Sequence, residues 1–255
     1  MFLLVYGSDG TGKSVQCKHI AEISDSPIHW SFATKNRRLY ESSGCPSIEL
    51  LAFNDDSTVN PYKTMDRFKD EVSKTIKANE VKLIVIDEIT LLRTWVQPVV
   101  IEEINRVRRG KQQDPITKIG ENNLAAWARV NALVYGELER LANWSEINDA
   151  IVIAITAVKD ERRLVEADDG MGKMVTKSVT TGKMVCDAKE NIRKLADVRV
   201  RLEKDGSKGK GYWMFLEKTQ GWMSMQTADG KPFSDEKKIE KDGVMTELMV
   251  RGVLT

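Results

Sequence analysis

The sequence is poor in the residues that build disulfide frameworks and zinc sites. It contains three cysteines and two histidines in 255 residues. Cys17, Cys45 and Cys186 are widely spaced, odd in number and without a C-x-x-C pair, so neither a disulfide scaffold nor a zinc site is expected. His19 and His29 lie far along the chain from any constellation of Asp, Cys or Ser, and we interpret both as structural.

The sequence also lacks a long hydrophobic run and an excess of charge of one sign. No apolar stretch reaches the roughly 20 residues that a membrane-spanning helix needs, and the apolar start at residues 1–6 is too short for a signal peptide. The formal net charge of +1 gives no global argument for binding to nucleic acid or to a membrane, so any basic binding surface must be local. We expect a cytoplasmic protein with no membrane partner.

The clearest signal present is residues 7–14, which read G-S-D-G-T-G-K-S and directly follow an apolar run. This is the pattern G-x-x-x-x-G-K-S of the P-loop, or Walker A motif. Gly7, Gly10 and Gly12 allow a tight loop whose backbone N–H groups point at one anion. The helical pattern that follows would add the positive end of a helix dipole.

Each part of this motif has an expected role. Lys13 would reach the β- and γ-phosphates, and the Ser14 hydroxyl would ligate Mg²⁺. The nucleotide is expected to contact Gly7, Ser8, Asp9, Gly10, Thr11, Gly12, Lys13, Ser14 and Val15. The N-K-x-D element that guanine recognition usually needs is absent, which favours ATP over GTP.

Apolar runs alternate with helical patterns over the first 157 residues. The expected strands are 2–6, 29–34, 48–53, 81–88 and 150–156, and the expected helices are 13–22, 62–77 and 123–143. This alternation predicts an α/β fold in which helices cover both faces of a mostly parallel sheet.

The pattern changes after residue 157. Alternating segments at 198–202, 212–217 and 222–226 predict a C-terminal antiparallel meander. Residues 234–250 are charged and have a short helical pattern. We therefore expect a core over residues 1–227 and a charged, helical extension over residues 228–255, without a strong boundary between them.

Two strand ends carry candidate catalytic residues. Asp87 ends a buried apolar strand, as a Walker B aspartate does, and would hold the magnesium ion. Glu88 follows and could activate the water that attacks the γ-phosphate, or it could begin a solvated helix turn. Thr156 ends the next strand and is either a γ-phosphate sensor or an ordinary buried threonine.

Two basic segments follow these strands, at residues 89–122 and 158–194, and we expect both to be loops. Loops at the carboxyl edge of a parallel sheet are well placed to bind a phosphate backbone, and the alternative is that they are solvated loops. The candidate DNA-binding residues are Arg93, Arg106, Arg108, Arg109 and Lys111 in the first segment, and Lys159, Arg162, Arg163, Lys173 and Lys177 in the second.

Taken together, residues 1–225 resemble the phage-encoded RecA-like AAA ATPases, which include core-only recombinases and single-strand-annealing proteins. The resemblance rests on the P-loop, on the strands that end in Ile86-Asp87-Glu88 and Ile155-Thr156-Ala157, and on the segment 195–198, read as part of a hairpin. It implies a RecA-like P-loop NTPase core, ATP bound between subunits of a ring or filament, and single-stranded DNA as the polymer ligand. A phage protein of this kind would work in the cytoplasm of its bacterial host.

The resemblance also implies a role for Lys218. The run 216–221 is similar to a K-x-R element that enters a neighbouring subunit's nucleotide site, but Gln220 stands where arginine is usual. Glu88 departs from those members that have serine after the aspartate.

The leading hypothesis is an ATP-binding and hydrolysing, Mg²⁺-dependent protein that binds single-stranded DNA in phage recombination, annealing or replication. Two alternatives use the same P-loop. One is a small-molecule or nucleotide kinase in which residues 158–194 form a lid. The other is a nucleotide-gated assembly protein with little turnover, which Gln220 favours.

Overall fold

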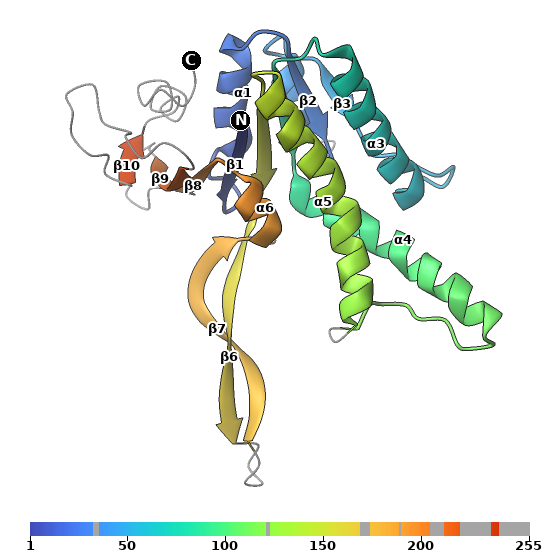
Figure 1. Ribbon diagram of the computed structural model, residues 1–255. Helices are drawn as coiled ribbons and strands as arrows, with labels where there is room; N and C mark the ends of the chain where they lie inside the picture. The colour runs from blue at the N-terminus through green and yellow to red at the C-terminus, as the bar shows by residue number, and fades with distance from the viewer. Residues whose placement is uncertain are drawn as a thin grey trace.

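The computed structural model describes residues 1–32, 36–120, 123–168, 174–188, 190–204, 212–219 and 236–239 (Figure 1). Its strands are β1 (Phe2–Gly7), β2 (Pro27–Ser31), β3 (Ser47–Glu49), β4 (Leu83–Asp87), β5 (Ile151–Thr156), β6 (Val158–Asp168), β7 (Met174–Cys186), β8 (Val198–Lys204), β9 (Tyr212–Thr219) and β10 (Glu236–Ile239). Its helices are α1 (Lys13–Ile23), α2 (Arg37–Glu41), α3 (Pro61–Ala78), α4 (Ile89–Gly110), α5 (Leu124–Ile147) and α6 (Glu190–Leu195).

Most of the strands form one sheet in the order β10-β9-β8-β1-β5-β4-β2-β3. The six strands from β8 to β3 in this order are mutually parallel, whereas β9 and β10 are antiparallel to their neighbours. The expected α/β fold with a mostly parallel sheet is confirmed. Strand β5 lies between β1 and β4, so the carboxyl ends of all three strands meet at one edge of the sheet.

Alternate residues of the central strands pack on opposite faces of the sheet, as the two-residue period of a strand requires. On β1, Leu4 and Tyr6 belong to a core shared with α3, α4 and α5, whereas Leu3 and Val5 belong to a core shared with α1 and α2. Helices therefore cover both faces. The continuous apolar runs of β1, β4 and β5 follow from burial on both sides.

Helix α3 shows how local signals set an element's bounds. Asn60 is its N-cap and accepts from the backbone N–H of Lys63 (2.9 Å), and Pro61 follows at the first helical position. Asn79 ends it in the left-handed region at φ 51°. Met65, Phe68 and Val72, which are spaced along one face of this helix, are buried.

The expectation that residues 89–122 form a loop is wrong. Residues 89–110 are the helix α4, which continues through Pro98. Ile89, Leu92, Val96 and Val100 are buried at helical spacing, and this apolar face supplies the packing that holds the segment as a helix.

The second expected loop is also ordered. Residues 158–168 and 174–186 are β6 and β7, which pair as a two-stranded antiparallel ribbon with an irregularity between Asp160 and Arg162. Figure 1 shows this ribbon projecting away from the main sheet. Backbone pairing, which depends little on side-chain pattern, accounts for regular structure in a segment with weak periodicity.

The C-terminal part of the sheet differs in detail from the expectation. Residues 190–195 are α6, and β8 then pairs in parallel with β1, so the segment at 195–198 joins a helix to a strand and is not a hairpin. Strand β10 lies within the range 234–250, for which we expected a helix, and pairs with the open edge of β9. The expected strand at 222–226 lies outside the described residues.

Two further observations concern the cysteines and the apolar character of the helices. Cys17, Cys45 and Cys186 are buried and form no disulfide, and burial raises the pKa of the Cys45 thiol to about 11. Within the described ranges, no helix combines the length and the apolar character that a membrane crossing requires.

The tight packing at the sheet edge predicts that Gly7→Ala destabilises the protein. A Cβ on Gly7 would lie 2.4 Å from the carbonyl oxygen of Leu202 and 2.6 Å from Oγ1 of Thr11. Relieving this overlap must move backbone, at a cost of about 1–3 kcal/mol. The measurement is the free energy of unfolding in urea.

Gly136→Ala is the matched control, because Gly136 lies in α5 and an added Cβ would meet no atom within 4 Å. There alanine should stabilise the helix by about 0.5–1 kcal/mol. Equal effects of the two substitutions would contradict the close approach at Gly7.

Candidate functional site

The 7–14 loop connects the end of β1 to the start of α1. Gly10 and Gly12 have positive φ angles of 77° and 80°, which glycine adopts without strain. The loop is closed by Thr11, whose backbone N–H and hydroxyl both donate to the carbonyl of Ser8, at 3.3 and 2.8 Å. The turn is therefore built from backbone conformations that most side chains disfavour.

Lys13 lies inside this loop. Its side chain is 8% exposed, and Nζ donates to the carbonyl oxygens of Gly7 (2.7 Å) and Ser8 (3.1 Å). An ammonium group carries three N–H donors, so these two bonds leave one for a further acceptor. The loop thus holds a buried positive charge at a fixed position.

Ser14, on the first turn of α1, reaches across to the end of β4. Its hydroxyl donates to Oδ2 of Asp87 at 2.9 Å. The Asn36 side-chain amide, which precedes α2, donates to the same oxygen at 2.8 Å and to Ser14 Oγ at 3.2 Å. Asp87 is 2% exposed, and these polar contacts offset part of the cost of burying its carboxylate.

A pocket of about 310 Å³ lies over the loop, and we call it the loop pocket. It brings together residues 9–15 with Asn36, Leu39, Asp87 and Glu88. Glu88 is the N-cap of α4 and makes no capping hydrogen bond with its side chain. The peptide bond between Asp87 and Glu88 is cis.

Sequence reasoning missed three residues beside this site. Besides Asn36, they are His29 and Tyr40, whose rings stack at 3.7 Å between centroids. The Tyr40 hydroxyl donates to the carbonyl of Ser14 (3.1 Å), and Nε2 of His29 lies 4.0 Å from Oδ2 of Asp87. Burial lowers the pKa of His29 to about 3, so its ring is neutral near pH 7.

Two of the expected catalytic residues lie away from the loop pocket. The Thr156 hydroxyl is buried and lies 2.8 Å from the hydroxyl of Thr90, which also accepts from the backbone N–H of Ala157 (3.1 Å). Lys218 lies on β9, where the backbone register places it opposite Arg199, near the amino end of β8. Since Gly7 pairs with Leu202 near the other end of β8, Lys218 lies toward the opposite edge of the sheet from its own loop pocket.

The expected DNA-binding residues fall on two separate elements. Near the end of α4, Arg106 and Arg109 are exposed, as is Lys111 just after it; Arg109 pairs with Glu102. Arg108 donates to the carbonyl of Asp114 at 2.5 Å. Arg93, in contrast, is half-buried near the start of α4, with its guanidinium 4.8 Å from the ring centre of Trp127.

The remaining candidates belong to the β6–β7 ribbon. Lys159 forms an ion pair with Asp187 at 2.8 Å. In the backbone register, Arg162 is opposite Thr180, Arg163 is opposite Val179, and Lys177 is opposite Val165. Lys173 lies outside the described residues.

The groups that line the loop pocket are of the types that could hold an anion and a divalent cation. A helix leaves its first N–H groups without partners in the helix, and the N-cap residue Gly12 has no side chain to accept from them. With Lys13, these donors suit an anion such as a phosphate group. The oxygens of Ser14 and Asp87 are of the type that Mg²⁺ prefers, and Mg²⁺ commonly takes only one or two carboxylates together with substrate phosphates.

No protein-family model matches the chain, and no curated protein matches it significantly.

The environment of His29 predicts a specific loss of stability in acid. Its pKa is lowered from an unfolded value near 6.5 to about 3, so the unfolded chain binds the proton first and stability falls as the pH drops through this window. Between pH 7 and pH 4.5 the loss from this group should be about 2–3 kcal/mol. Urea unfolding at both pH values, without nucleotide or metal, measures it.

His29→Phe is the comparison variant, because it keeps a ring against Tyr40 but cannot titrate. Its stability should fall less than that of the parent over the same interval. A variant that loses as much stability as the parent would show that His29 is not buried as the neutral form.

Proposed function

We propose that this protein binds ATP with Mg²⁺ in the loop pocket and hydrolyses it. The observation that carries the proposal is the 2.9 Å hydrogen bond between Ser14 and Asp87, which joins the two expected magnesium ligands beside a loop that already buries Lys13. If the glycine-lysine pattern had occurred by chance, there would be no reason for its serine to contact an aspartate at the end of another strand. The bound ion would supply charge neutralisation between phosphate oxygens.

Each residue of the loop pocket has a separate role in this proposal. Lys13 and the first N–H groups of α1 would hold the phosphates, and Ser14 and Asp87 would orient the ion. Glu88 lines the same pocket and is the candidate base for the attacking water. Thr156 would act indirectly, through Thr90 at the start of α4, because its hydroxyl is directed to that residue.

We extend the proposal to single-stranded DNA. Helix α4 follows β4 and the β6–β7 ribbon follows β5, so both extend from the sheet edge that carries the loop pocket. In Figure 1 the end of α4 and the ribbon project as two separate arms. Their basic residues would contact phosphates along the strand, in phage recombination, annealing or replication, as the RecA-like resemblance implies.

Assembly of several copies is part of the same proposal. Lys218 cannot serve the loop pocket of its own chain from the far edge of the sheet, so a role for it requires a neighbouring copy. A RecA-like P-loop NTPase in a ring or filament would provide that neighbour.

The first experiment measures ATP affinity and turnover in variants of the pocket. Lys13→Ala removes a buried charge from the phosphate site and should weaken ATP binding about tenfold to hundredfold. Glu88→Gln should keep ATP binding but slow release of phosphate about 10²- to 10⁴-fold, since it removes the base. Lys18→Ala is the control, because Lys18 lies on the same helix and pairs with Glu22 instead.

Unchanged ATP binding by Lys13→Ala would overturn the site. Persistent turnover in Glu88→Gln would mean that the base lies elsewhere. Transfer of the phosphate to a nucleoside offered in the assay would assign the chain to the kinases instead.

The second experiment measures binding to a single-stranded oligonucleotide as a function of salt, with an ATP analogue present. Arg106→Ala removes an exposed charge from α4, and the slope of log K against log salt should become shallower by about 0.7 for each phosphate that the side chain neutralises. Arg163→Ala on β6 should act in the same way. Lys74→Ala on α3, where Lys74 pairs with Glu71, should leave the slope unchanged.

No binding at low salt, or equal slopes for all three variants, would contradict the DNA proposal while leaving the ATP proposal untouched.

A further inference from the structure

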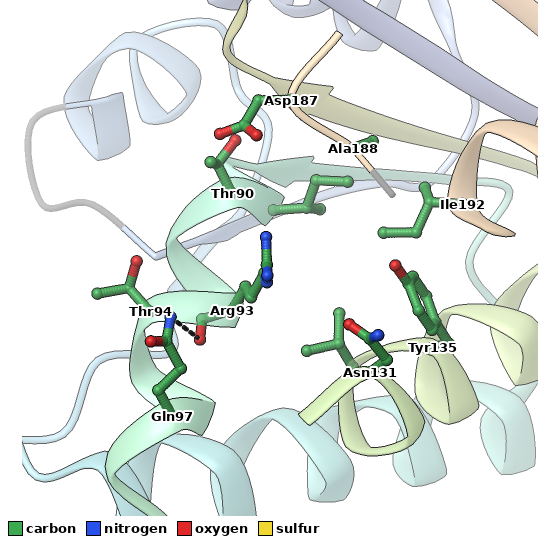
Figure 2. A pocket seen from close by; sticks show the side chains of 11 residues that line it. Thr90, Arg93, Thr94, Gln97, Asn131, Tyr135, Asp187, Ala188 and Ile192 are labelled. Carbon is green, nitrogen blue, oxygen red and sulfur yellow. Dashed lines mark hydrogen bonds between the residues drawn. The ribbon is translucent and has the colours of Figure 1, made fainter. Parts of the chain in front are cut away.

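A second cavity lies between α4, α5, α6 and the base of the β6–β7 ribbon, and we call it the arginine cavity. Its volume is about 120 Å³, enough for several water molecules. Its polar walls are Thr90, Thr94 and Gln97 from one helix and Asn131 and Tyr135 from another, with Arg93 between them (Figure 2). It shares no lining residue with the loop pocket.

Two lining residues of this cavity carry a buried polar atom without a hydrogen-bond partner among the described residues: Nε of Arg93 and the hydroxyl of Tyr135. Nε of Arg193 on α6, one residue after the lining residue Ile192, is also buried without a partner. Tyr135 is 9% exposed, and Figure 2 shows its hydroxyl and the Arg93 guanidinium directed toward the same space. A buried polar atom without a partner costs about 1–3 kcal/mol, which a ligand with acceptor atoms would recover.

The position of the Arg93 guanidinium is fixed, and its N–H donors are available to such a ligand. It lies 4.8 Å from the ring centre of Trp127, a cation–π distance that fixes its plane but uses none of its N–H groups. The Gln97 amide donates to the backbone carbonyl of Arg93 (3.4 Å), not to its side chain. The guanidinium therefore keeps its donors for the cavity.

The charge around the cavity is positive. Asp187 is a lining carboxylate, but it pairs with Lys159 at 2.8 Å. Burial raises the pKa of Tyr135 to about 12, while the charges of Arg93 and Arg193 oppose the rise. The hydroxyl thus stays protonated as a donor, and both guanidinium groups are close enough to act on it.

We propose that the arginine cavity binds a phosphate group, held by Arg93 and the Tyr135 hydroxyl, with the charge of Arg193 nearby. Buried donors without partners, the positive charges of Arg93 and Arg193, and room for only a few heavy atoms match a tetrahedral oxyanion and exclude a whole nucleotide. The group can come from free phosphate or from a phosphodiester. The site does not depend on the proposed ATPase activity, because its residues are separate from the loop pocket.

The test is equilibrium dialysis with radioactive inorganic phosphate. The background is Lys13→Ala, which weakens phosphate binding by the loop pocket. In this background one phosphate should bind per chain, and adding Tyr135→Phe or Arg93→Gln should weaken it at least about tenfold. Tyr62→Phe and Arg140→Gln are matched controls on exposed positions of α3 and α5, and should bind as the background does.

Absence of saturable binding, or equal binding in all variants, would overturn the proposal. Tyr135→Phe removes only one oxygen, so it keeps the test valid if Arg93→Gln fails to fold. Displacement of the bound phosphate by a thymidine dinucleotide would identify a phosphodiester as the source, and retention would identify the free anion; either result supports the site.

Discussion

The hydrogen bond from Ser14 to Asp87 is the contact on which the arrangement of the site depends. It connects the first turn of α1 to the end of β4, although β5 separates β1 from β4 in the sheet. The contact is possible because the three strands are parallel and end at one edge, over which α1 begins. Burial of the Asp87 carboxylate then requires polar neighbours, which Ser14 and Asn36 supply. The loop, the start of α2 and the start of α4 are thereby held around one carboxylate.

Elements with strong local signals could be predicted from the sequence. The apolar runs of β1, β4 and β5 and the glycine-lysine loop identified the central strands and α1 within one or two residues at each end. The neighbours of Asp87 could not be predicted. His29 and Asn36 reach it only because β2 pairs with β4, with Ser31 opposite Asp87. Strand order depends on packing of the whole chain, so it cannot be predicted from the local sequence around the few residues that it brings together.

The prediction that residues 89–122 form a loop was wrong because it was based on the arginines near residue 106. The helical spacing of the buried apolar residues makes residues 89–110 a helix, and Pro98 does not interrupt it. Arg93 shows the consequence: grouped with the exposed basic residues, it instead packs on Trp127 and faces the arginine cavity. The turn at Glu88 and Ile89 separates the two pockets, with Glu88 lining one and Ile89 the other.

The central claim is that Ser14 and Asp87 act together on a magnesium ion beside a bound triphosphate. A double-mutant cycle tests it most directly, with ATP-analogue affinity measured with and without Mg²⁺ for Ser14→Ala, Asp87→Asn and the double variant. We expect each single substitution to abolish most of the gain in affinity that Mg²⁺ gives. The double variant should bind the analogue no more weakly than the more damaging of the two single variants does, because the two groups serve one ion. Fully additive losses, or an affinity that does not respond to Mg²⁺ in the unmodified protein, would contradict the account.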